Sequence, residues 1–158
     1  MDKETGTLAL AVVTILAVFV AVQPLLPSHA QPFSELGILG PDQKIGGYPT
    51  TLTAGQQFLL YGYVGNHEGI VSYYEVLVKL GNQSTEISNS TYANIPTLST
   101  YSLVLDSNQS STFPIGLSVN QTGTNLRLIF ELWRFNTTAY QFEYTGLRDQ
   151  LFIIVTSK

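Results

Sequence analysis

The sequence predicts an antiparallel β-sandwich over residues 33–158, preceded by one membrane-spanning helix. Two observations predict the all-β domain, and a third predicts the helix. After residue 32 no helical periodicity appears, and short β-branched and aromatic runs alternate with turn residues. Before that point lies a long apolar stretch without a charge. Because 44% of the residues are hydrophobic, we expect one folded domain rather than a disordered chain.

The first predicted element is the uncharged segment 8–26, LALAVVTILAVFVAVQPLL. As a helix it reaches about 28 Å, close to the roughly 30 Å hydrocarbon thickness of a bilayer. Pro24 and Pro27 end or kink it, because proline lacks the backbone donor. We therefore expect a cytoplasmic segment at 1–7, a signal anchor contacting membrane lipid at 8–26 and a linker at 27–32. This is the topology of a single-pass protein of the cell membrane whose C-terminal domain is extracellular.

Two other interpretations of this segment stay open. Ser28-His29-Ala30 resembles a secretory cleavage site, although Asp2-Lys3-Glu4 lacks the positive charge that normally precedes a secretory signal. The segment also resembles the assembly helix of an archaeal-type pilin, but Pro24 stops it early. We favour the uncleaved anchor over both.

The remaining elements are short strands separated by turn residues. Seven or eight antiparallel strands at this spacing are typical of an immunoglobulin-like or fibronectin-like sandwich, although no Cys…Trp…Cys pattern marks an antibody-type domain. The predicted strands are Phe33–Leu39, Gln57–Val64, Ile70–Leu80, Ser84–Ser88, Thr97–Leu105, Thr112–Val119, Asn125–Phe135 and Asp149–Thr156.

Alternation along three strands predicts which side chains face the core. In 112–119 the inward residues are Phe113, Ile115, Leu117 and Val119, and Pro114 places this strand at a sheet edge because proline cannot donate to a ladder. Two further strands supply facing core positions, at Leu126, Leu128, Phe130 and Leu132, and at Ile70, Tyr74, Val76, Val78 and Leu80. The opposite face of the second strand carries Arg127, Ile129, Glu131 and Trp133, and on the third strand we expect Glu75 and Lys79 on the solvent side.

Charge and cysteine content exclude several function classes. The net charge is -4 and the chain has only seven lysines and arginines, so the clustered cations that bind nucleic acid are missing. The absence of cysteine excludes disulfides, thiolate metal sites and thiol nucleophiles. We expect no cofactor.

Five Asn-x-Ser/Thr sequons follow the apolar segment. Such sequons are used when they lie on surface loops outside the cytoplasm, which supports an outside domain carrying N-linked glycans. Each lies in a predicted connection between strands. The acceptor residues are Asn82, Asn89, Asn108, Asn120 and Asn136.

The triplet Asn66-His67-Glu68 is the strongest candidate for chemistry. As a functional site, His67 and Glu68 would act as a base or as metal ligands. Zinc needs three or four convergent ligands, whereas the one other imidazole, His29, lies beside the anchor. We therefore interpret the triplet as a polar turn flanked by Gly65 and Gly69. No catalytic or metal-ligating residue is predicted, because the other carboxylates are scattered and no nucleophile or phosphate-loop motif occurs.

Residues 33–80 resemble the archaeal domain-of-unknown-function family sixteen-sixteen. The resemblance rests on an E-L-x-I-L-G-P-like stretch, a Tyr-Pro leading to an L-T-x-G turn, and an Asn-His-Glu between two strands. Longer members carry several transmembrane helices, so the single span departs from them. The resemblance implies archaeal origin, membrane attachment and a sandwich domain, and no activity. The matching positions are Glu35, Leu36, Leu39, Gly40, Pro41, Tyr48, Pro49, Gly55, Asn66, His67 and Glu68.

These features predict a non-catalytic, membrane-anchored surface glycoprotein that acts as a structural or docking subunit of a membrane or envelope complex. Residues 31–80 contain no sequon, so we expect protein partners there, including the loop Asn66, His67 and Glu68, and not over Asn89, Asn108 or Asn120. One alternative is a pilin-like or strand-exchanging filament subunit. Another is an extracytoplasmic enzyme or metal binder that uses His67 and Glu68.

Overall fold

A computed structural model describes residues 31–158, in which every regular element is a β-strand. The predicted segments 1–7 and 8–26, and most of the linker 27–32, lie outside the described residues. Within the described part, no helix is long and apolar enough to cross a membrane. The strands are β1 (Phe33–Leu39), β2 (Thr51–Thr53), β3 (Gln57–His67), β4 (Ser72–Asn82), β5 (Thr97–Leu105), β6 (Gln109–Ser118), β7 (Gly123–Asn136) and β8 (Gln141–Thr156).

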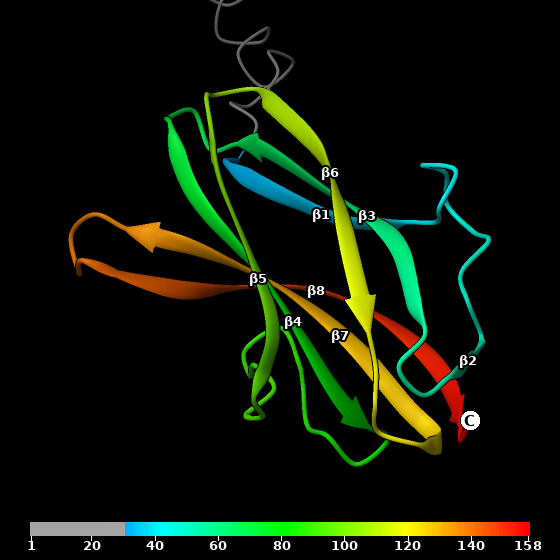
Figure 1. Ribbon diagram of the computed structural model, residues 1–158. Helices are drawn as coiled ribbons and strands as arrows, with labels where there is room; N and C mark the ends of the chain where they lie inside the picture. Colours follow the sequence, from blue (N-terminus) through cyan, green and yellow to red (C-terminus); the bar gives the residue numbers. More distant parts are fainter. Residues whose placement is uncertain (1–30) are drawn as a thin grey trace, which may run out of the picture. The chain divides into compact units, whose positions relative to one another are not determined.

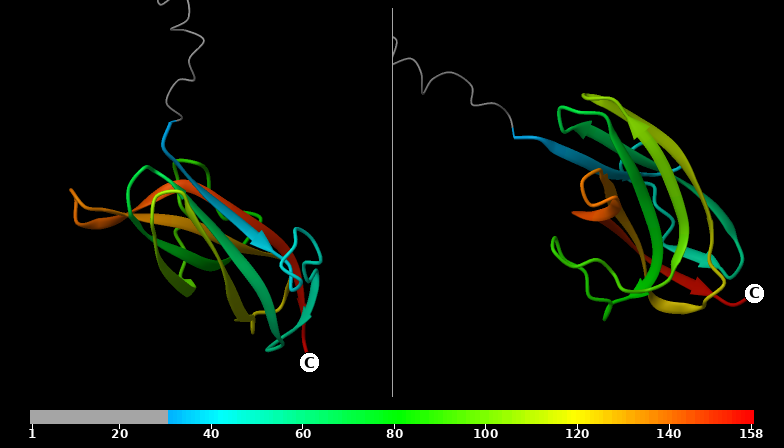
Figure 2. Two further views of the ribbon diagram at one scale, coloured as in Figure 1. Left: turned by 90° about the horizontal axis from the view of Figure 1, so that it is seen from above. Right: turned by 90° about the vertical axis from the view of Figure 1, so that its left-hand side faces the viewer.

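Two sheets form the sandwich (Figure 1). One has three strands in the order β1-β3-β6, and the other has five in the order β2-β8-β7-β4-β5. All pairings are antiparallel except that of β2 with β8. The two further views show the sheets as layers, with the tip of the β7–β8 hairpin projecting beyond them (Figure 2). The chain crosses from one layer to the other at five connections, which are β1–β2, β2–β3, β3–β4, β5–β6 and β6–β7.

Most predicted strands are confirmed, and the exceptions have local causes. No strand forms over Ser84–Ser88, because side chains bond the nearby backbone: Asn82 Oδ1 accepts Ser84 N at 2.9 Å and Thr85 Oγ1 accepts Asn82 N at 3.0 Å. Strand β2 is too short to give a periodic signal. Strand β8 starts at Gln141, earlier than the predicted Asp149. It continues through Gly146 because glycine readily adopts the φ of +83° found there.

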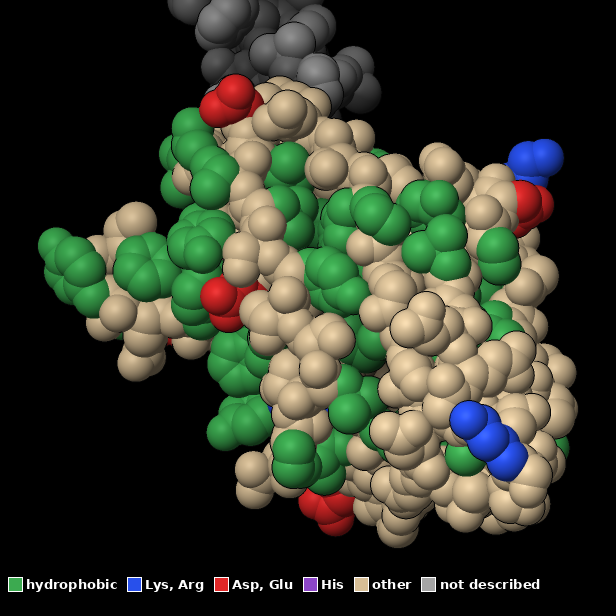
Figure 3. Space-filling model, in the orientation of Figure 1, with side chains coloured by type: hydrophobic (Ala, Val, Ile, Leu, Met, Phe, Trp, Pro, Cys, Tyr) green, Lys and Arg blue, Asp and Glu red, His purple; other side chains and the backbone are tan. Residues whose placement is uncertain are grey.

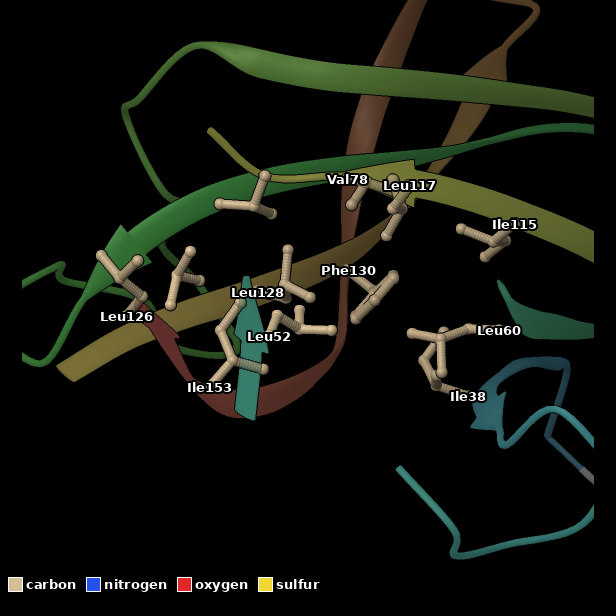
Figure 4. Close-up of a cluster of buried hydrophobic side chains, with 12 residues drawn as sticks. Ile38, Leu52, Leu60, Val78, Ile115, Leu117, Leu126, Leu128, Phe130 and Ile153 are labelled. Atoms are coloured by element: carbon tan, nitrogen blue, oxygen red, sulfur yellow. The ribbon is translucent and has the colours of Figure 1, made fainter. Parts of the chain in front are cut away.

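The core lies between the two sheets and follows the predicted alternation. Ile115, Leu117 and Val119 of the β6 region are buried, as are Leu126, Leu128, Phe130 and Leu132 of β7 and Tyr74, Val76 and Val78 of β4. Figure 4 shows side chains from both sheets pointing toward one another in the larger of two clusters. Pro114 lies in β6, an edge strand of the three-stranded sheet, as predicted. Ile70 is the exception: it precedes β4 and is 65% exposed.

The prediction that Lys79 faces solvent is wrong, and Glu131, on the face of β7 opposite the predicted core, is buried with it. Their side chains are 5% and 0% exposed, and Lys79 Nζ lies 2.9 Å from Glu131 Oε2. The connection between β4 and β5, residues 83–96, covers this outer face of the five-stranded sheet; we call it the strap. Lys79 Nζ donates to Ala93 O at 2.7 Å, and Ala93 N donates to Glu131 Oε1 at 2.6 Å. A buried ion pair therefore joins the strap to the sheet.

Aromatic and polar contacts complete this attachment. The rings of Tyr92 and Trp133 lie 5.3 and 5.9 Å from Lys79 Nζ, within the range of cation–π interaction. Arg127 donates to Thr85 O, and Tyr144 Oη donates to Ser88 O at 3.0 Å. Burial raises the pKa of the Tyr144 phenol further above the neutral range, in which the phenol is already a protonated donor.

Candidate functional site

Asn66, His67 and Glu68 lie at the end of the domain where β1 begins and β3 ends. Asn66 and His67 are the last residues of β3 and pair with Ser34 and Phe33, so the expected turn is shifted along the chain. The bend follows them, at residues 68–71, with Gly69 at a φ of +78°. On its other side β3 pairs Asn66 with Gln109 of β6. The triplet thus joins the ends of three strands.

Asn66 is fully buried and links this bend to the β5–β6 turn. Its Nδ2 lies 2.8, 2.9 and 3.0 Å from the carbonyl oxygens of Ile70, Leu105 and Asp106, which share its two N–H donors. Its Oδ1 accepts Glu68 N and Tyr74 Oη, both at 3.1 Å. One amide therefore satisfies backbone groups from two separate connections.

His67 is held on both sides of its ring. The ring stacks on Phe33 with centroids 4.5 Å apart. Nε2 lies 3.5 Å from Glu35 Oε2, which also accepts Tyr63 Oη at 3.0 Å, and Nδ1 lies 3.4 Å from Asn108 Oδ1. Both ring nitrogens thus face an oxygen of a neighbouring side chain.

Glu68 is held by an ion pair and a hydroxyl. Its Oε2 pairs with Arg134 of β7, and its Oε1 accepts Ser34 Oγ at 2.6 Å. Ser34 Oγ lies 2.9 Å from Tyr74 Oη, which connects this contact to Asn66. The side chains form one continuous polar network between the two sheets.

This network can hold the nearby surface of the domain in a fixed position, because its polar groups are already bonded to one another. His67 and Glu68 each engage different partners and are not hydrogen-bonded to one another as a base and its orienting carboxylate. Among residues 31–158, no three side chains of His, Asp or Glu gather in a way that holds a metal ion. His29 lies outside the described residues.

An exposed apolar groove lies beside the network, and the sequence did not indicate it. Ile70, Val71, Tyr73 and Val104 are between 39% and 65% exposed. They border a groove of about 410 Å³ that Pro32, Glu68, Arg134 and Phe135 also line. The Tyr73 ring lies 5.0 Å from that of Phe142, which extends the surface toward the β7–β8 hairpin. Ile70 and Val71 were missed because alternation assigned them to a strand that starts only at Ser72.

Three sequon residues lie in connections, as expected, and two lie in the last positions of strands. Asn82 and Asn136 are the last residues of β4 and β7, Asn89 lies in the strap, and Asn120 follows β6. Asn108 occupies the β5–β6 turn at a φ of +61°, which asparagine tolerates well. All except the half-buried Asn136 are exposed.

Although residues 31–80 contain no sequon, two sequon residues lie beside the triplet and the groove. Asn108 contacts His67 directly, and Asn136 lines the apolar groove. Sequence separation concealed this, because the β5–β6 turn and the end of β7 pack against the same end of the domain as β3.

Other residues of the family resemblance support the fold. A Cβ at Gly40 would lie 2.1 Å from Gly46 O, so only glycine fits that turn. Tyr48 Oη donates to Ile38 O at 2.7 Å, tying the β1–β2 connection to β1. Glu35, His67 and Glu68 belong instead to the polar network described above.

Comparison with known proteins identifies a family and a fold. No curated protein matches the chain. Among solved structures, a CARDB domain from Pyrococcus furiosus, crystallised in complex with di-metal ions, matches with a TM-score of 0.51 and 11% identity over 83% of this chain and 99% of that one. A solution structure of that CARDB domain gives a TM-score of 0.49 at 12% identity, covering 79% and 95% of the two chains. A β-glucosidase from Listeria innocua in complex with glucose gives 0.48 at 12% identity, with 78% of this chain and 16% of that one covered.

At such low identity the similarity to the CARDB crystal structure establishes an immunoglobulin-like sandwich fold and nothing further. The family comparison is made on the sequence itself. Residues 27–149 match the family described as a domain of unknown function, DUF1616. This span covers most of the sandwich and includes every position of the resemblance found in the sequence. The chain therefore belongs to the DUF1616 family and carries its domain as an immunoglobulin-like β-sandwich.

Proposed function

We propose that this protein is a non-catalytic, membrane-anchored docking subunit whose sandwich binds another membrane or envelope protein outside the cytoplasm. The observation that carries the proposal is the groove beside the polar network. Its exposed apolar side chains, Ile70, Val71, Tyr73 and Val104, are clustered, and clustered apolar exposure is characteristic of protein–protein contact sites.

The network beneath the groove supports a binding role because it fixes the groove before a partner arrives. Asn66 holds Ile70 O, and the Glu68–Arg134 ion pair connects the bend to β7. A pre-organised surface loses little conformational entropy on binding. The same bonds use the polar groups of His67 and Glu68 to hold the groove in place. This favours a role in protein contact over catalysis or metal binding.

Membrane attachment is proposed from residues 8–26. The linker 27–32 connects that segment to Phe33 at the start of β1, and seven residue steps reach at most roughly 25 Å. The groove lies at the same end of the domain as Phe33, since Pro32 lines it. We therefore propose that the partner is an integral membrane protein or one bound close to the membrane surface.

The proposed contact surface is narrower than the whole sequon-free stretch 31–80. Asn108 beside His67 and Asn136 in the groove border it, so glycans at these positions would limit its extent. The contact is therefore assigned to the side bearing Ile70, Val71 and Tyr73. Asn82, Asn89 and Asn120 remain available for glycans.

The experiment is affinity purification of the tagged full-length chain from its own membranes in mild detergent, followed by identification of co-purifying proteins. We expect one membrane protein to be recovered with the unaltered chain and to fall at least about tenfold with I70E/V71E, because buried unpaired charge opposes association. The matched control is I45E/F152E, which charges two exposed apolar side chains outside the groove. Equal recovery with both variants would contradict the proposal.

The filament alternative receives no support from the described strands. In that alternative a segment after Ala30 leaves its own chain and pairs with the next copy. Here β1 pairs with β3 of the same chain in a continuous register from Phe33↔His67 to Leu39↔Tyr61. The enzyme or metal-binder alternative predicts that His67→Ala abolishes an activity or metal binding without unfolding the domain.

A further inference from the structure

Strand β5 is an unprotected edge of the five-stranded sheet. It pairs with β4 along Thr97–Leu105, with a register shift that leaves Leu98 without a partner in β4, and it ends the strand order, so its other side offers free backbone donors and acceptors. Natural edges are usually blocked by proline, by charges or by a covering segment. Edge strand β6 contains Pro114, whereas β5 has neither proline nor charge, and the sequence is uncharged from Ile87 to Leu105.

The side chains of β5 divide into an inward and an outward set. Tyr101, Leu103 and Leu105 pack against the core clusters. The outward set is Leu98, Thr100, Ser102 and Val104, all exposed, with Leu98 at 47% and Val104 at 63%. Figure 3, seen from the side on which β5 runs in front, shows hydrophobic side chains gathered over and beside this strand.

The outward set is symmetrical about Tyr101. We propose that β5 pairs antiparallel with β5 of a second copy of this chain, around a two-fold axis at Tyr101. In that register Leu98 of each copy lies opposite Val104 of the other, and Thr100 lies opposite Ser102. The pairing joins two five-stranded sheets edge to edge.

This register matches the apolar and polar side chains on both strands. Each exposed apolar side chain gains an apolar partner, and each hydroxyl gains a hydroxyl. No like charges meet, since the strand is uncharged. A two-fold contact of this kind is self-complementary and closes at two copies, which favours a dimer over an open filament.

The space beside β5 leaves the edge approachable. The opening between edge strands β5 and β6 is a groove of about 460 Å³ lined by Thr100, Ser102, Ser111 and Pro114 among others. The apolar groove of the proposed docking function touches β5 only at Val104. The two proposed surfaces share Val104, so the docking proposal is tested at Ile70 and Val71, which the proposed dimer does not use.

Cysteine cross-linking of the full-length chain in detergent tests the register, and the chain has no cysteine of its own. We expect rapid disulfide formation when L98C chains are mixed with V104C chains, because directly opposed residues bring their Cα atoms within about 6 Å. Neither variant should cross-link alone, since residue 98 lies about 20 Å from residue 98 of the other copy in this register. Cross-linking of L98C alone would indicate parallel pairing and overturn the proposal, as would no cross-linking in the mixture.

Charged substitutions at positions 98 and 104 distinguish this register from non-specific hydrophobic association. L98K/V104K places like charges opposite one another and should raise the dimer dissociation constant at least about tenfold, whereas L98K/V104E places opposite charges there and should retain the dimer. Both positions are exposed, so the thermal midpoint of each monomer serves as the folding control. If the unaltered chain is monomeric by sedimentation at micromolar concentration, or if both variants dimerise equally, β5 is not the interface.

Discussion

At the scale of single residues, Asn66 explains how a short polar triplet organises one end of the domain. Its side-chain amide replaces backbone partners that the bend after β3 and the turn after β5 would otherwise lack. A buried carbonyl that loses its hydrogen-bond partner costs about 1–3 kcal/mol. The residue that resembled part of an active site is thus a structural link, and His67 and Glu68 occupy the positions it defines.

Replacing Asn66 with Ala should lower the free energy of unfolding by about 3 kcal/mol, because several buried groups lose partners at once. The measurement is urea unfolding followed by tryptophan fluorescence, since Trp133 lies in β7. His67→Ala is the control: its side chain is 31% exposed, and we expect a loss below about 1 kcal/mol. Equal losses for the two variants would show that Asn66 is not the link.

At the scale of elements, the strap changes the role of the outer face of the five-stranded sheet. Lys79 and Glu131 lie on β4 and β7 and reach the same strap residue, Ala93. The paired charges are almost without solvent contact and gain their stability from one another and from the Ala93 backbone. Removing one charge leaves the other buried without its partner.

Lys79→Met should therefore lower the free energy of unfolding by about 3–5 kcal/mol, whereas K79M/E131L should recover most of that loss. Calorimetry or urea unfolding of the single and double variants completes the cycle. If the loss in the free energy of unfolding of the double variant equals the sum of the losses of the two single variants, the pair does not act as a unit.

The strap also marks the limit of prediction from sequence. Alternation correctly assigned the β6 and β7 core because those strands carry apolar residues on every second position. It failed at Lys79, since the burial of Lys79 and its partner Glu131 comes from the strap, and alternation reports only which residues share a face. The prediction that Ile70 faces the core failed for a related reason. The start of β4 is set by the Asn66 network, which no local pattern encodes.

The candidate site was predicted in part. The family positions Asn66, His67 and Glu68 were recognised, and their location at a strand end was close to that observed. Their partners were not predictable: Glu35, Asn108 and Arg134 come from three other parts of the chain. Contacts between distant segments depend on strand order, and strand order is set by the packing of the whole sandwich.

At the scale of the whole molecule, the domain presents surfaces of different character. The end bearing Phe33 has the fixed polar network and the apolar groove, and the side bearing β5 has a self-complementary edge. In the proposed arrangement residues 8–26 anchor the chain, the groove binds a membrane protein and the β5 edge joins two copies. Asn82, Asn89 and Asn120 line neither the apolar groove nor the opening beside β5.

The central claim is that the groove contacts one particular membrane protein. The most direct measurement places a photoreactive amino acid at Val71 or, as a control, at the exposed Ile45, and illuminates the full-length protein in its own membranes. Contact in the groove predicts one discrete adduct with a membrane protein from position 71 and no such adduct from position 45. Absence of an adduct at position 71, or the same adduct from both positions, would contradict the claim.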